Sequence, residues 1–171
     1  MAQQYKSNCM VRLVRPEDAE QLSAIYNYYI ETSGVTFEED KIASSEMRSR
    51  IQKINVKNNF PFLVYEEEGQ IKGYAYATTF RERVAYRFSV ESTVYVAKEH
   101  FGKGIGRILY AALLDELKKG DYHSVIGVIT LPNEPSIRLH ESFGFKKVGH
   151  FTEVGYKFEQ WMDVGFWELL L

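Results

Sequence analysis

The chain has 171 residues with a formal net charge of −2, and 45% of its residues are hydrophobic and 26% charged. These values indicate a globular domain with one core over residues 1–171, and they argue against a nucleic-acid partner, which requires concentrated positive charge. The polar start MAQQYKSN and the lack of an apolar run of about 20 residues predict neither a signal peptide nor a membrane span. Because Cys9 is the only cysteine, no internal disulfide is possible and a cytoplasmic protein is expected.

The first half of the chain predicts one strand, two helices and three further strands. Pro16 suits the first turn of a helix, and the acids Glu17, Asp18 and Glu20 suit its positive end, so the first helix begins there. It ends at the breakers of residues 32–34. The second helix is predicted over 44–57, and the strands over 10–14, 62–66, 71–80 and 89–96.

The second half alternates helices and strands. A glycine loop over 100–106 precedes a helix over 107–119, whose apolar residues recur at helical spacing and which ends at Gly120. A strand over 124–129, a short helix over 135–143 and two β-rich segments over 146–153 and 157–171 follow. Because a meander of strands precedes this unit, the predicted class is α+β, with a mixed, mostly antiparallel sheet flanked by helices.

The glycine loop is the first candidate binding element. Strand residues Val94, Tyr95 and Val96 precede it, the run Gly102-Lys103-Gly104-Ile105-Gly106 forms it, and Arg107 follows. Glycines let the backbone approach a ligand closely, and the start of a helix offers free N–H groups and a positive dipole end. The loop therefore predicts a pyrophosphate site, although such a run also occurs as a plain strand-to-helix turn.

Three ligand classes compete for this loop. A Walker loop needs Lys and then Ser or Thr at its end, but Arg107 follows Gly106. A dinucleotide fingerprint belongs in a βαβ unit, whereas a strand meander comes first here. Coenzyme A remains: its pyrophosphate would lie on the amides of residues 104–106, and its amide-rich arm would pair with the edge of Val94–Val96 as an added strand.

Several ordered runs, spread over nearly the whole chain, are informative together. They are Tyr28-Tyr29-Ile30-Glu31-Thr32-Ser33 with Thr36-Phe37, Val90-Glu91-Ser92-Thr93-Val94-Tyr95-Val96, Leu131-Pro132-Asn133-Glu134-Pro135-Ser136, Leu139-His140-Glu141, Gly144-Phe145, and Gly155-Tyr156-Lys157-Phe158 with Trp161 and Asp163-Val164-Gly165-Phe166-Trp167. Together they resemble the GNAT superfamily of acetyltransferases, and within it the phosphinothricin and methionine-sulfone N-acetyltransferase branch. Two residues depart from the pattern: Phe101 replaces the usual Gln or Arg of the loop, and Glu159 takes a place often held by Gly.

The resemblance implies acetyl transfer from acetyl-CoA to the α-amine of a small, amino-acid-like substrate such as phosphinothricin, methionine sulfone or methionine sulfoximine. An α-amine with a pKa near 8 is mostly protonated at neutral pH, so a base must accept its proton. Glu91 is the predicted general base, because it shares a strand face with Thr93 and Tyr95 and lies within a matching run. An exposed glutamate or an ion pair is the alternative for Glu91.

His140 stands where the superfamily commonly has a Tyr that is thought to protonate the departing thiolate, and where the closer branch has His. It is predicted to act as general acid or as a second base, while a packed histidine is the alternative. The N–H of Val94 is expected to polarise the thioester carbonyl. Asn133 and Ser136 are predicted to contact the coenzyme, to cap the following helix, or to do both.

An acidic group on the substrate would require a cation, and Arg81, Arg83 and Arg87 precede the Glu91 strand with guanidinium groups that match carboxylate or phosphinate oxygens. Arg83 with Tyr86 most resembles the pattern of the branch, so Arg83 is the predicted partner. Thr93, Phe37 and Trp161 complete the predicted substrate set, with Tyr29 as a further wall residue. No metal is predicted, since the four histidines show no ligand spacing.

A homodimer is expected, because the apolar C-terminal segment needs cover and the resembling branch is generally dimeric. Two alternatives to a small-molecule enzyme remain. One is an N-acetyltransferase for proteins or peptides, which needs an open groove. The other is a non-catalytic acyl-CoA-binding protein, which would have no need of Glu91.

Overall fold

The computed structural model describes residues 9–171 as a seven-stranded sheet in the order β1-β2-β3-β4-β5-β7-β6. The predicted α+β class with a mixed, mostly antiparallel sheet is confirmed. The strands are Cys9–Leu13 (β1), Phe62–Glu67 (β2), Gln70–Thr79 (β3), Ser89–Val96 (β4), Ser124–Leu131 (β5), Lys146–Lys157 (β6) and Gln160–Leu170 (β7).

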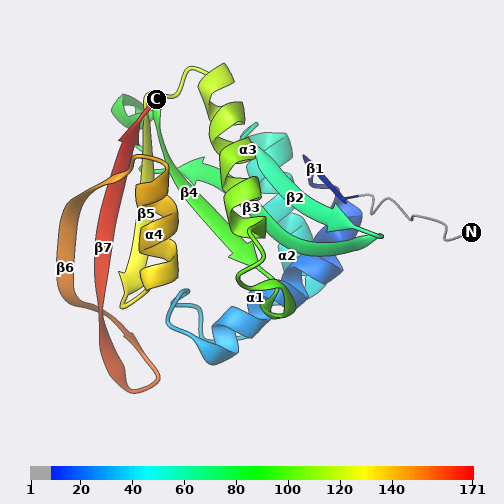
Figure 1. Ribbon diagram of the computed structural model, residues 1–171, viewed down its shortest axis with the longest axis horizontal. Coiled ribbons are helices and arrows are strands. Elements are labelled where there is room, and N and C mark those ends of the chain that lie inside the picture. The colour runs from blue at the N-terminus through cyan, green and yellow to red at the C-terminus, as the bar shows by residue number, and fades with distance from the viewer. Residues whose placement is uncertain (1–8) are drawn as a thin grey trace, which may run out of the picture.

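Four α-helices cover the two faces of the sheet, with α3 and α4 on one face and α1 and α2 on the other (Figure 1). The helices are Ala19–Thr32 (α1), Ser44–Ile51 (α2), Ile105–Lys119 (α3) and Glu134–Ser142 (α4). None of those within residues 9–171 is long and apolar enough to cross a lipid bilayer. The β6–β7 hairpin lies at the edge of the sheet farthest from β1 (Figure 1).

Each face of the sheet has its own core. The α3 side is filled by Leu109, Leu113 and Leu117, which are fully buried against strand residues such as Val90 and Val125. The other side packs α1 and α2 against the sheet through residues that include Leu22, Ile30, Ile51, Tyr74 and Tyr95. Because Val90 and Tyr95 of β4 belong to opposite cores, Glu91 and Thr93 share the face of Tyr95, as the alternation predicted.

One strand pair creates a gap in the sheet. Every neighbouring pair is antiparallel except β4 and β5, which run parallel and pair only from Ser89↔Ser124 to Ser92↔Gly127. Beyond Ser92 the two strands diverge (Figure 1), so the second half of β4 has no strand neighbour on that side.

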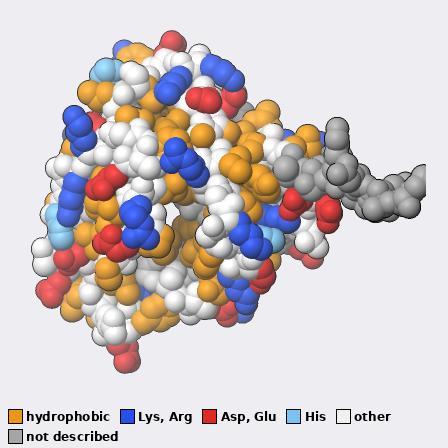
Figure 2. Space-filling view, viewed as in Figure 1, with side chains coloured by type: hydrophobic (Ala, Val, Ile, Leu, Met, Phe, Trp, Pro, Cys, Tyr) orange, Lys and Arg blue, Asp and Glu red, His pale blue; other side chains and the backbone are white. Residues whose placement is uncertain are grey.

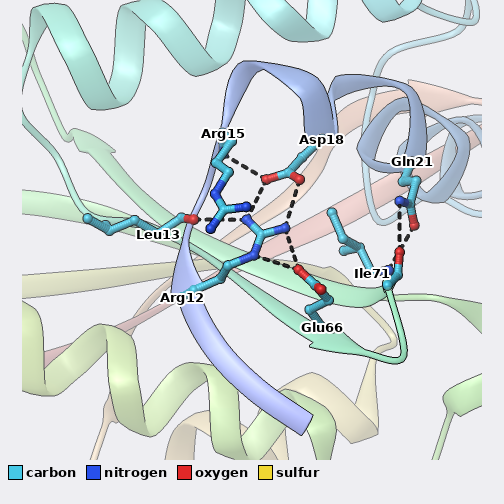
Figure 3. A network of polar contacts seen from close by, with 8 residues as sticks. Arg12, Leu13, Arg15, Asp18, Gln21, Glu66 and Ile71 are labelled. Atoms are coloured by element: carbon cyan, nitrogen blue, oxygen red, sulfur yellow. Dashed lines mark hydrogen bonds and ion pairs between the residues drawn. The ribbon is translucent and has the colours of Figure 1, made fainter. Parts of the chain in front are cut away.

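An ionic network fixes the start of the chain to the sheet (Figure 3). The guanidinium of Arg12 donates to both oxygens of Asp18 at 2.8 Å and through Nε to Glu66 at 2.6 Å. Burial alone would raise the pKa of Asp18, but the hydrogen bonds from Arg12 and from the Arg15 N–H outweigh it and hold that pKa below its ordinary value. The network therefore joins β1 and β2 to the turn that begins α1.

Several predicted boundaries were wrong. The third helix begins at Ile105 rather than 107, because Gly104 with a φ of 80° already serves as its N-cap. The second helical stretch covers the predicted residues 44–57, but only Ser44–Ile51 is α-helical and Gln52–Lys57 is π-helical. The β-rich segment predicted to end at 153 extends to Lys157, since the hairpin turns at Phe158 and Glu159, with φ of 53° and 60°.

Candidate active site

The open edge of β4 presents the backbone of Val94 and Val96. Ala97 N donates to Lys72 O at 2.8 Å, and in an antiparallel ladder alternate residues face alternate edges. The N–H and C=O groups of Val94 and Val96 therefore point toward the side from which β5 has diverged. The space-filling view shows this face of the molecule hollowed between α4 and the start of α3 (Figure 2).

The glycine loop closes one end of this gap. Gly102 and Gly104 have φ of 74° and 80°, a conformation that side-chain-bearing residues rarely adopt. A Cβ at either position would meet no atom within 4 Å, so the backbone is accessible there. The first helical hydrogen bond runs from Ile108 N to Gly104 O at 3.1 Å, which leaves the preceding N–H groups of residues 105–107 outside the helical ladder.

The side chains of the loop contribute less than its backbone. Ile105 is buried in the α3 core, and Lys103 Nζ lies 3.4 Å from His100 Nδ1. Arg107 reaches across to α4, where Nη1 donates to Ser142 Oγ at 2.9 Å and the guanidinium lies 5.0 Å above the Phe143 ring. A pyrophosphate at this loop would thus be held chiefly by backbone N–H groups and the positive end of α3.

Glu91 lies on the opposite side of β4 from α3, and its carboxylate has no described hydrogen bond or ion pair within residues 9–171. Burial raises its pKa above the ordinary glutamate value. Thr93, on the same face, lies directly opposite Tyr76 of β3, and burial raises the pKa of Tyr76 to about 12. Tyr76 was not predicted from the sequence, because only the pairing of β3 with β4 places it opposite Thr93.

His140 of α4 is buried, with 4% of its surface exposed. Its Nδ1 lies 2.8 Å from Ser136 O, and since a carbonyl only accepts, Nδ1 carries the proton. Burial lowers the pKa of the imidazole. Nε2 is therefore unprotonated in the neutral ring, and it has no hydrogen-bond partner among the described residues.

The imidazole of His140 fits against β5 at Gly127. A Cβ at Gly127 would lie 2.5 Å from Cδ2 and 2.6 Å from Nε2 of the ring, so only glycine leaves room for it. Tyr110 and Phe145 pack on the ring at centroid distances of 4.9 and 5.1 Å. Gly127 was not predicted as a site residue, although a glycine inside a buried strand is a signal of close approach.

Asn133 and Ser136 have the structural role that the sequence analysis allowed. Asn133 Oδ1 accepts a hydrogen bond from Ser136 N at 3.2 Å, which makes Asn133 the N-cap of α4. The Ser136 carbonyl in turn orients His140. Asn133 thus caps the start of α4, and the Ser136 carbonyl one turn before His140 holds the imidazole in the last turn of that helix.

Residues 33–37, which include the predicted substrate residue Phe37 and are called the substrate loop below, are fastened to the β6–β7 hairpin. The Phe37 ring covers Gly155, where a Cβ would lie 2.1 Å from Cζ. Lys157 is 2% exposed, and its ammonium donates to Ser33 O at 3.0 Å and to Thr36 O at 2.8 Å. Trp161 is 62% exposed and packs on Tyr156 at 4.9 Å. Lys157 was missed as an anchor because its partners lie far away in the sequence.

Arg83 and Tyr86 belong to the exposed loop that connects β3 to β4. Tyr86 packs on Phe80 at 5.9 Å, and the guanidinium of Arg81 lies 5.9 Å from its ring. No described contact joins Arg83 to Glu91 or to the substrate loop. The structure therefore brings Glu91 and Thr93 together but leaves Arg83 free in solvent within the described chain.

A separate cavity of about 600 Å³ opens at the opposite end of α3, between Phe60, Phe88 and Tyr122. None of the predicted site residues lines it, so we place the candidate active site at the gap between β4 and β5. Within residues 9–171 no group of three His, Cys, Asp or Glu side chains is arranged to hold a metal ion.

Comparison with known proteins gives the family. Residues 11–165 match the family described as the acetyltransferase (GNAT) domain. The chain is 41% identical over 158 residues to a phosphinothricin N-acetyltransferase of Streptomyces viridochromogenes. The alignment covers 91% of this chain and 85% of the relative.

Two solved structures share the fold. A phosphinothricin acetyltransferase from Sinorhizobium meliloti in complex with acetyl-CoA superposes with a TM-score of 0.91 at 34% identity, over 95% of this chain and 88% of that one. A ribosomal-protein-alanine N-acetyltransferase from Brucella melitensis superposes with a TM-score of 0.92 at 36% identity, over 95% and 99%. With a family match over most of its length, this chain belongs to the GNAT family of acetyltransferases.

Proposed function

We propose that the protein transfers the acetyl group of acetyl-CoA to the α-amine of a small amino-acid-like substrate of the phosphinothricin, methionine sulfone or methionine sulfoximine type. The observation that carries this proposal is the divergence of β4 from β5, which leaves the backbone of Val94 without a strand neighbour. Glu91 lies on one face of the sheet near this gap, and His140 lies on the other face. The phosphinothricin acetyltransferases to which the chain is similar support the choice of acceptor.

Acetyl-CoA supplies the acetyl group as a thioester. The backbone N–H groups of residues 104–106, near Gly102 and Lys103, would hold its pyrophosphate, and the edge of Val94–Val96 would pair with the amides of its arm. The accessible backbone at Gly102 and Gly104 fits the pyrophosphate, and the edge of β4, which has no neighbouring strand beyond Ser92, fits the arm.

Glu91 is the proposed general base. Its carboxylate has no cationic partner among the described residues, and burial raises its pKa toward that of the ammonium it must deprotonate. The free amine can then attack the thioester directly, while the N–H of Val94 stabilises the developing negative charge on the carbonyl oxygen.

His140 fits the role of a second base better than that of a general acid. A general acid requires the imidazolium, which burial disfavours, whereas the neutral ring presents a bare Nε2. Such a nitrogen can accept a hydrogen bond from a thiol or a water molecule. We therefore propose that His140 takes the second proton of the amine as the C–N bond forms and returns it to the sulfur of coenzyme A as the C–S bond breaks.

For the acceptor, we propose that Arg83 binds the acidic group of the substrate and that Phe37, Thr93, Tyr86 and Trp161 shape its pocket. Arg83 is exposed and has no described ion pair that would occupy it within residues 9–171.

The similarity to a ribosomal-protein-alanine N-acetyltransferase favours a protein N-terminus as a second candidate acceptor. Of these two acceptors we favour the smaller substrate, because the phosphinothricin acetyltransferases to which the chain is similar act on it.

We further propose a cytoplasmic homodimer. The outer edge of β6 is unpaired in the described sheet, and the β6–β7 hairpin exposes large apolar side chains, namely Val148, Phe151, Val154, Tyr156, Phe158 and Trp161. A second copy of the chain would cover them symmetrically. Within the C-terminal segment expected to contribute, Phe158 and Trp161 are exposed, whereas Val164 and Trp167 are buried in the core of the chain itself.

The proposal is tested by measuring thiol release from acetyl-CoA across phosphinothricin, methionine sulfone, ordinary amino acids and peptides with free N-termini. We expect kcat/KM for the phosphinate or sulfone to exceed that for any peptide by at least about tenfold. Faster turnover of a peptide would replace the small-molecule function with a protein-acetylating one, and thiol release with no acceptor would contradict both.

A further inference from the structure

The hydroxyl of Tyr29 reaches from α1 to the open edge of β4. It donates to Val96 O at 2.7 Å and accepts from Val96 N at 3.3 Å. These are the two backbone groups of Val96 that face the gap left by β5. One hydroxyl group thus occupies the strand edge where, on the proposed function, the arm of acetyl-CoA would pair.

An incoming ligand would affect the two hydrogen bonds between Tyr29 and Val96 differently. A carbonyl oxygen has two lone pairs, so Val96 O can keep its short bond from Tyr29 and still accept a second donor. The Val96 N–H has one proton, and its longer contact to Tyr29 is the weaker of the two. An incoming amide carbonyl can therefore take the N–H without disturbing the bond to Val96 O.

We propose that Tyr29 is a positioning residue for acetyl-CoA: its hydroxyl fixes the Val96 carbonyl and thereby holds the end of β4 in place to receive the pantetheine arm. The inference rests on the proposed cofactor site at Val94–Val96. Tyr29 therefore contributes to the affinity for acetyl-CoA, whereas the sequence suggested that it lines the substrate pocket.

The ring of Tyr29 extends this positioning to the glycine loop. Its centroid lies 4.9 Å from that of Tyr95, 5.5 Å from Tyr28 and 6.3 Å from Phe101. Phe101 is the residue that departs from the family's polar side chain. Its ring, also 6.3 Å from Tyr28, contacts α1, so the loop is joined to the same helix as the strand end.

The hydroxyl of Tyr29 remains a donor throughout the working range of such an enzyme. Burial is the main cause that raises its pKa to about 12, while the Val96 backbone contact lowers it by less. The positioning contact is therefore expected to be independent of pH between 6 and 9.

The test compares Tyr29→Phe with Tyr28→Phe. Both changes remove one hydroxyl from the same aromatic cluster, but no hydrogen bond of the Tyr28 hydroxyl is described within residues 9–171. For Tyr29→Phe we expect the calorimetric Kd and the KM for acetyl-CoA to rise about three- to tenfold, with kcat and the KM for the amine unchanged. Tyr28→Phe should keep wild-type values.

Three results would overturn the inference. Equal acetyl-CoA affinity in wild type and Tyr29→Phe would mean that the hydroxyl does not position the strand. Tighter binding would mean that it competes with the cofactor, and a fall in kcat at unchanged KM would place it in the chemistry. Gly104→Val reports separately on the proposed cofactor site, which fails if that variant binds acetyl-CoA as wild type does.

Discussion

The imidazole of His140 packs directly against the backbone of Gly127. The packing is so close that a Cβ added at Gly127 would lie only 2.5 Å from Cδ2 of the ring. The absence of a side chain at Gly127 therefore lets the imidazole of His140 lie close to β5. Since Nδ1 is already bonded to Ser136 O, any side chain at residue 127 must push the ring off that bond or tilt α4.

We expect Gly127→Ala to lower kcat at least about tenfold while changing the Kd for acetyl-CoA less than threefold, because His140 is displaced but the glycine loop is not. Stopped-flow thiol release and calorimetry measure the two quantities. Gly149→Ala is the matched control, since a Cβ there makes only ordinary contact with Phe166 at 3.6 Å.

His140→Gln should resemble Gly127→Ala in this comparison, and combining the two changes should cost little more than either alone, since both act on one group. If the double variant lost the sum of the two single losses in activation free energy, Gly127 would affect kcat by a route other than the position of His140. A fully active His140→Gln would remove the histidine from the mechanism.

Glu91→Gln is expected to lower kcat by about a hundredfold and to remove the acidic limb of the pH–rate profile. Because burial raises the pKa of Glu91, that limb should lie above the ordinary glutamate range. Turnover in wild type should fall as the pH drops through this raised pKa. A Gln variant with the wild-type rate from pH 6 to 9 would make Glu91 structural.

The same shift predicts the stability of the variant. A carboxyl whose pKa is raised on folding binds its proton more tightly in the folded state, so ionised Glu91 destabilises the fold at neutral pH. Glu91→Gln should therefore melt at the same temperature as wild type or higher at pH 8. A lower melting temperature would attribute its loss of activity to unfolding.

The sequence predicted the elements that carry local signals. The strand Ser89–Val96, the glycine loop and the face shared by Glu91 and Thr93 followed from alternation and glycine spacing. The contacts that complete the site join distant residues: Tyr29 and Val96 are 67 positions apart, and Lys157 and Thr36 are 121 apart. No local pattern specifies such pairs, so Tyr76 and Lys157 could be assigned only from the fold, whereas Gly127 carried a local signal that did not identify His140 as its neighbour.

Glu159→Gly is expected to stabilise the protein by about 0.5–1 kcal/mol. Phe158 and Glu159 form the β6–β7 turn with φ of 53° and 60°, a left-handed conformation that costs a side-chain-bearing residue roughly 1 kcal/mol, part of which glycine loses again in chain entropy. Thermal unfolding should show a rise of about 1–4 °C. An unchanged or lower melting temperature would mean that the Glu159 side chain makes a compensating contact.

The proposed homodimer predicts that Phe151→Glu shifts the sedimentation coefficient at micromolar concentration from a dimer to a monomer, since Phe151 is 56% exposed on the unpaired edge strand. Val56→Glu is the control, because Val56 is 72% exposed but lies after α2, away from the hairpin. A wild-type monomer with full activity would contradict both the dimer and its role at the site.

Mass spectrometry of the reaction products tests the central claim most directly. After incubation with acetyl-CoA and methionine sulfone, we expect an N-acetylated sulfone in amounts equal to the thiol released, and a protein of unchanged mass, because the amine attacks the thioester without an acetylated enzyme. Thiol release without an N-acetylated product, or an acetylated protein that later donates to the amine, would contradict the account.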